Sequence, residues 1–76
     1  MNSIQVDFLG LKKLGKEFID ALPTADIDAV DAGFKCFSLA YLGCEYANSG
    51  EQLQARYLIQ IIGRAMVKRE IELGEA

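Results

Sequence analysis

Residues 26–48 constrain the fold most, because this stretch carries apolar or small side chains around nearly its whole helical circumference. At 100° per residue, its polar positions fall in one narrow stripe, made of Asp28, Asp31, Lys35, Ser38 and Glu45. A helix that is apolar almost all round is the buried, central helix of its fold. Two neighbouring helices of a small domain would cover it poorly, so the pattern predicts a second copy of the chain as further cover.

Two breaks divide the 76 residues into three segments of helical periodicity. The first break is the turn sequence around Pro23, and the second is Ser49-Gly50. The sequence therefore predicts a single all-α domain over residues 1–76, with three helices at about 3–22, 26–48 and 50–73. We expect helix 26–48 to be central and buried, and the domain to form a homodimeric helical bundle.

The first and third segments each have one apolar face and a start signal. In the first, Asn2 and Gln5 fit a capping box, and the expected core face holds Ile4, Phe8, Leu11, Leu14, Phe18, Ile19 and Leu22. Its Gly10 and Gly15 cost about 1 kcal/mol each relative to alanine, and would allow a close helix approach. In the third, Ser49 and Gln52 fit a capping box, Gly74 fits a C-terminal cap, and the expected core face holds Leu58, Ile61, Ile62, Ala65 and Met66.

Helix 26–48 also carries a seam of small residues opposite its polar stripe. Their spacing is four, three, four, three and four: Ala29, Gly33, Cys36, Ala40, Gly43 and Ala47. Small residues at both positions of a heptad seam let two helix backbones come unusually close. Three occupants fit the groove: another helix of the same chain, the same helix of a second copy across a two-fold axis, or a helix of a different protein.

Several large apolar residues fall among the polar positions of their helices, and they form a second candidate surface. Single exposed apolar residues mean little, but this many in a short chain indicate a contact surface. Tyr57 and Arg64 are its candidate anchors, because tyrosine and arginine are enriched among residues that dominate binding energy. The predicted partner surface comprises Val6, Leu9, Leu42, Leu53, Tyr57, Arg64 and Ile71. A homodimer that buries all of them is the alternative.

The residue types argue against catalysis, cofactors and metals. The chain has no histidine, the side chain most often used in general acid–base catalysis. Cys36 and Cys44 have neither an adjacent base nor the spacing of a zinc site. One helix would hold them about 12 Å apart, too far for a disulfide within the chain. We expect two small buried thiols in a reducing cytosol, and a disulfide between two chains is the alternative.

Other broad classes are disfavoured by pattern and charge. The longest apolar stretch, 36–44, is far shorter than the roughly 20 residues of a membrane span, and residues 1–13 lack the basic start of a signal peptide. We therefore expect a cytoplasmic protein. The net charge of −3 argues against general nucleic-acid binding. A nucleic-acid-associated alternative would use the basic faces of the first and third helices, through Lys12, Lys16, Arg64 and Lys68.

The excess of apolar residues, without any motif for chemistry, predicts a function in protein–protein contact. Hydrophobic residues make up 51% of the chain, more than so small a domain easily buries. We expect a non-enzymatic regulator or adaptor whose partners are itself and another protein. Analogy with small phage- or mobile-element-encoded antagonists favours an inhibitor that sequesters or blocks its partner. A structural subunit of a larger assembly is the remaining alternative.

Overall fold

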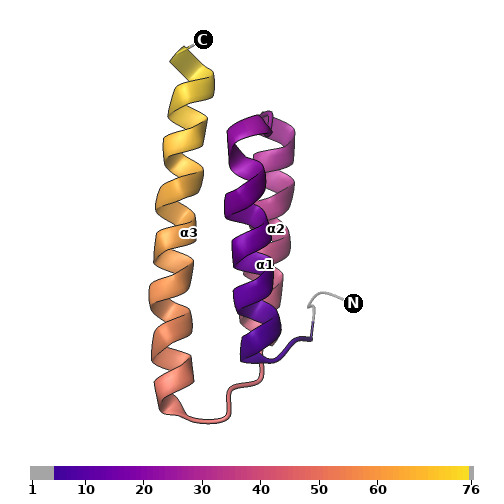
Figure 1. The fold of residues 1–76 in the computed structure, drawn as a ribbon, viewed down its shortest axis with the longest axis vertical. Coiled ribbons are helices and arrows are strands. Elements are labelled where there is room, and N and C mark those ends of the chain that lie inside the picture. Colours follow the sequence, from indigo (N-terminus) through magenta and orange to yellow (C-terminus); the bar gives the residue numbers. More distant parts are fainter. Residues whose placement is uncertain (1–4, 76) are drawn as a thin grey trace.

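The computed structural model describes residues 5–75 and confirms the all-α fold with three helices. They are α1 (Phe8–Ala21), α2 (Ile27–Gly43) and α3 (Ser49–Glu75), with a short 3-10 turn, η1 (Leu22–Thr24), after α1. Figure 1 shows α1 and α3 running in the same direction and α2 running against them. Each helix packs against the other two, and α3 extends beyond both at its C-terminal end (Figure 1).

The first two helices begin at aspartates that cap free backbone N–H groups. The Asp7 carboxylate accepts a hydrogen bond from Gly10 N at 2.8 Å, and that of Asp26 accepts one from Ala29 N at 2.9 Å. The predicted start of the first helix near residue 3 is wrong for residues 5–7, which are not helical, because Asp7 provides the cap. The predicted Asn2 cap and the core position Ile4 lie outside the described residues.

The start of α3 resembles a capping box, one residue earlier than predicted, except that Glu51 bonds the residue before the cap. The Asn48 side chain accepts a hydrogen bond from Glu51 N, and the Glu51 carboxylate accepts one from Ala47 N, both at 2.9 Å. Asn48 therefore takes the role predicted for Ser49, and Glu51 the role predicted for Gln52. At the other end, α3 continues through Gly74 to Glu75, so Gly74 does not end the helix as predicted.

Helix α2 ends at Gly43, whereas the sequence predicted a helix to residue 48. Its C-terminal neighbour Cys44 has an extended backbone, and Glu45 N donates a hydrogen bond to Val6 O at 3.0 Å. The rings of Phe8 and Tyr46 lie 6.4 Å apart beside this bond. Pairing with the N-terminal segment and aromatic packing therefore replace the last helical turn.

The centre of the core lies at Gly15 of α1, where the three helices meet. A Cβ atom at Gly15 would lie 3.2 Å from Phe37 of α2, 3.5 Å from Ile62 and 3.6 Å from Leu58, both of α3. The missing side chain thus makes room for side chains of both other helices, as predicted for this glycine. The buried core comprises Phe8, Leu11, Phe18, Leu22, Val30, Phe37, Ala40, Ala55 and Ile62.

Helix α2 is not the buried, central helix in the single chain. It buries Val30, Phe37 and Ala40, while Ile27 and Leu42 are exposed. The long helix α3 packs against both α1 and α2, so the three helices form a triangle in which each helix keeps an open face. The apolar residues around α2 predicted a more complete burial of this helix than α1 and α3 provide.

A first prediction concerns Gly33, where α1 and α2 approach closely. An added methyl group would lie 2.8 Å from Cδ1 and 2.9 Å from Cε1 of the Phe18 ring, so one side chain or a backbone segment must shift. We expect Gly33→Ala to lower the free energy of unfolding by about 1–2 kcal/mol in urea denaturation, despite the better helix propensity of alanine. Gly74→Ala is the control, because a Cβ at Gly74 would have no neighbouring atom within 4 Å. An equal loss of stability in both variants would contradict the close approach at Gly33.

Candidate protein-binding surface

The structure places the small-residue seam of α2 partly inside the chain and partly at its surface. Ala40 is fully buried, Gly33 and Gly43 are half-buried, and the other three members are exposed: Ala29, Cys36 and Ala47. At Gly33 the groove holds Phe18 of the same chain. Ala47 lies beyond the end of α2, so the seam does not run unbroken along one helix.

The two cysteines differ in their surroundings. Both thiols are free, but Cys36 is exposed and only Cys44 is half-buried. The prediction of two buried thiols is therefore wrong for Cys36, which lies at the open edge of the groove between α1 and α2. Burial raises the pKa of the Cys44 thiol above its ordinary value, which lowers its reactivity at neutral pH.

The predicted partner surface divides among all three helices. Val6 packs against the core, whereas Leu9 on α1 and Leu42 on α2 are exposed singly. Its other four members lie on α3 and share one face of that helix: Leu53, Tyr57, Arg64 and Ile71. Only the four residues on α3 form a continuous surface.

These four residues belong to a longer row, which we call the outer α3 stripe. It consists of Leu53, Tyr57, Gln60, Arg64, Val67 and Ile71, spaced four, three, four, three and four. This heptad spacing places all six along one side of a helix. The stripe points away from α1 and α2, because the buried Ile62 is two residues, or about 200°, from both Gln60 and Arg64.

The apolar members of the stripe are large and open to solvent. Relative exposures are 49% for Leu53, 58% for Tyr57, 48% for Val67 and 55% for Ile71, and the adjoining Ile61 is 55% exposed. The sequence interpretation did not single out Val67, and it placed Ile61 in the core, which is wrong. The signal was available in the spacing, which repeats on α3 the pattern noted on residues 29–47.

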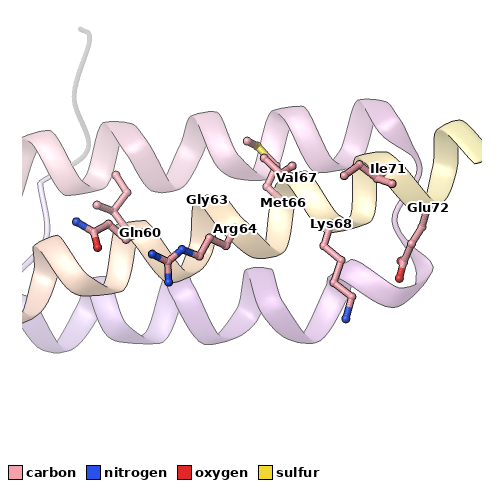
Figure 2. A pocket seen from close by; sticks show the side chains of 9 residues that line it. Gln60, Gly63, Arg64, Met66, Val67, Lys68, Ile71 and Glu72 are labelled. Carbon is pink, nitrogen blue, oxygen red and sulfur yellow. The ribbon is translucent and has the colours of Figure 1, made fainter.

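A shallow groove of about 710 Å³ follows the C-terminal half of this stripe. Figure 2 shows its lining side chains, with Met66 and Val67 toward one edge and Lys68 and Glu72 toward the other. Gly63 lies within this groove and leaves it open beside Val67. The lining combines apolar side chains with the charged groups of Arg64, Lys68 and Glu72, and such a combination is typical of protein contact surfaces.

Charged residues of both signs flank the stripe on the side of α2. Arg56 is exposed near the start of α3, where a small hollow also contains Leu42. Near the other end, a hydrogen bond with the Asp31 side chain of α2 raises the pKa of Glu70 above its ordinary value. Two carboxyl groups of adjacent helices thus lie together there, so a positive charge brought close would be favoured.

The basic residues considered for nucleic-acid binding are partly engaged within the chain. Lys16 forms an ion pair with Asp20 at 2.8 Å, and the Lys12 ammonium lies 4.9 Å from the centre of the Phe8 ring. Arg64 and Lys68 are exposed on α3, with Glu72 in the same groove. The four cations therefore do not form an uninterrupted basic patch.

Comparisons with models of protein families, with curated proteins and with solved structures return no match. Among residues 5–75, no helix has the length and apolar content needed to cross a membrane. Within the same residues, no three side chains of the types histidine, cysteine, aspartate or glutamate gather at one place that could hold a metal ion.

Proposed function

We propose that this chain is a non-enzymatic regulator or adaptor that works through protein–protein contact, with the outer α3 stripe as its contact surface. Its mode of action is inhibition, in which the domain sequesters or blocks a partner protein. A cytoplasmic location is part of the proposal, since two unpaired thiols fit a reducing compartment. One observation carries the proposal: large apolar side chains aligned along an open helix face.

The arrangement of α3 supports binding rather than stability of the single chain. Ala55 and Ile62 already anchor the opposite face of the helix in the core, so the exposed apolar residues contribute little to the isolated fold. Because the helix is formed before a partner arrives, binding does not have to overcome the cost of helix nucleation. The face offers a helix of another protein an apolar track with Tyr57 and Arg64 as anchors.

The two alternatives fit the surface less well. Nucleic-acid binding would need a run of free cations, but Lys16 pairs with Asp20 and Glu72 lies beside Lys68. A structural subunit would form an open assembly that grows with concentration, whereas one stripe on one helix provides a single contact face. We therefore favour a regulator with a defined partner.

Photo-cross-linking tests the proposed contact surface in cells of the native host. A benzoylphenylalanine replacing Tyr57 would place the reactive group on the outer α3 stripe, and one replacing Lys13 would place it on the exposed side of α1. We expect irradiation to link the chain to a discrete foreign protein from position 57 and not from position 13. The products are resolved by gel electrophoresis and identified by mass spectrometry.

The outcomes separate the parts of the proposal. The same products from both positions, or none from position 57, would show that the stripe is not the contact surface. A product that contains only the chain itself would remove the inhibitor function, because no foreign partner would then occupy the face.

A further inference from the structure

We infer that the free chain covers the outer α3 stripe with the same stripe of a second copy, the two α3 helices running antiparallel about a two-fold axis level with Ile62. The inference rests on the proposed function only in using the same stripe as a binding surface. It replaces the small-residue seam of α2 as the site of self-association. A foreign partner would then exchange with the second copy.

The stripe is self-complementary in this register. In an antiparallel pair centred at residue 62, Leu53 faces Ile71 of the second copy, and Tyr57 faces Val67. Gln60 faces Arg64, so its side-chain carbonyl can accept from the guanidinium. Each layer occurs twice because a two-fold axis relates them. The outer layers supply apolar contact, and the polar central layer specifies the register at some cost in affinity.

The residues beside the stripe also match in the same register. On the side of α1, the exposed Ile61 meets Ile61 of the second copy close to the axis. On the side of α2, Gly63 meets Gly63, where the absence of side chains allows close helix approach. Farther out on that side, Arg56 lies opposite Glu70 of the second copy, which pairs opposite charges.

Arg56 of the second copy would bring a positive charge to the neighbouring carboxyl groups of Glu70 and Asp31. The Asp31 side chain lies beside Glu70 and raises the pKa of Glu70, first through hydrogen bonding between the carboxyl groups and also through charge repulsion. An approaching guanidinium would relieve the repulsion between the two carboxylates. By contrast, a parallel dimer in register would place Arg64 against Arg64 in one layer and leave Arg56 and Glu70 far apart.

Sedimentation equilibrium of the full chain with charge exchange tests the pairing. We expect a dimer of twice 8.4 kDa, weakened roughly tenfold by Arg56→Glu or by Glu70→Arg, since each change places like charges together twice. The double variant Arg56→Glu/Glu70→Arg should restore the affinity. Within one chain these positions are about 21 Å apart along the helix, beyond the screening length of about 8 Å, so rescue must arise between chains.

Cross-linking with a short bis-maleimide tests the direction of the helices. In a background with Cys36→Ser and Cys44→Ser, we expect a chain with Leu53→Cys to link to a chain with Ile71→Cys when the two are mixed. Two copies of the same variant should not link, because their cysteines would lie about 27 Å apart along the helix axis. Both positions are exposed, and circular dichroism checks that each variant keeps its helices.

Three results would overturn the inference. These are a monomer at every concentration, a dimer that the charge exchange neither weakens nor rescues, and self-linking of either single-cysteine chain. A monomer whose position 57 still cross-links to a foreign protein would remove the self-association and keep the proposed function. An intact antiparallel dimer without any foreign product from position 57 would remove the proposed function and keep the self-association.

Discussion

Phe37→Ala is expected to remove most of the stability of the domain. Phe37 is 1% exposed, and its ring lies over Gly15 where the three helices meet. Truncation leaves a cavity that α1 and α3 cannot both fill, at a cost of about 3–5 kcal/mol. A chain of 76 residues is expected to have only about 4–11 kcal/mol in total. Urea denaturation followed by circular dichroism measures the loss as a lower midpoint at unchanged slope.

Phe34→Ala is the matched control on the same helix. Phe34 is half-buried and packs with its ring centre 6.5 Å from that of Phe18, near the edge of the core. Its truncation should cost clearly less than that of Phe37, because solvent can reach part of the space left behind. An equal or larger loss in Phe34→Ala would show that the packing centre does not lie at Gly15.

Arg69→Met is expected to cost about 1.5–3 kcal/mol, the usual range for hydrogen bonds made by a charged group. Arg69 reaches from α3 to the loop before α2, where its Nε and Nη2 atoms both donate to Ala25 O, at 3.0 and 2.9 Å. Methionine preserves the apolar stem and removes both donors, which leaves the carbonyl without these partners. Thermal and urea unfolding should both show the loss.

The neighbouring ion pair provides a control for the Arg69 prediction. Arg69 Nη1 lies 3.6 Å from Glu72 Oε1, whose side chain is 52% exposed. Removal of this carboxylate in Glu72→Gln should change stability by at most about 1 kcal/mol, because exposed ion pairs are weak. If Arg69→Met unfolds at the wild-type midpoint, the link between α3 and the Ala25 carbonyl does not contribute to stability.

The helices could be predicted from the sequence because their signals are local. Pro23 marks the turn after α1, Asp26 caps α2, and periodic apolar residues define the core face of α1. The end of α2 could not be predicted, because the extended segment after Gly43 is held by Val6, which is distant in sequence. A tertiary contact of this kind overrides local helix propensity.

The candidate surface could be predicted only in part, for a physical reason. Leu53, Tyr57 and Ile71 were identified because they interrupt a polar face, and Arg64 because arginine is enriched among residues that dominate binding energy. Ile61 was assigned to the core, since α3 carries apolar residues on two sides and periodicity does not tell which side faces the other helices. The packing of Ile62 and Ala55 settles the orientation of α3, and the outer α3 stripe follows from it.

The hydrogen bond between Glu45 N and Val6 O also bears on the order in which the growing chain folds. Domains emerge from the ribosome N-terminus first, so both partners of this bond leave the ribosome before α3 does. The first two helices are then joined at both ends, by η1 at one end and by this bond at the other. Until Ile62 and Leu58 emerge, the face of this helical hairpin at Gly15 lacks the α3 side chains that pack there. A nascent chain stalled at that stage would expose apolar surface that the finished protein hides.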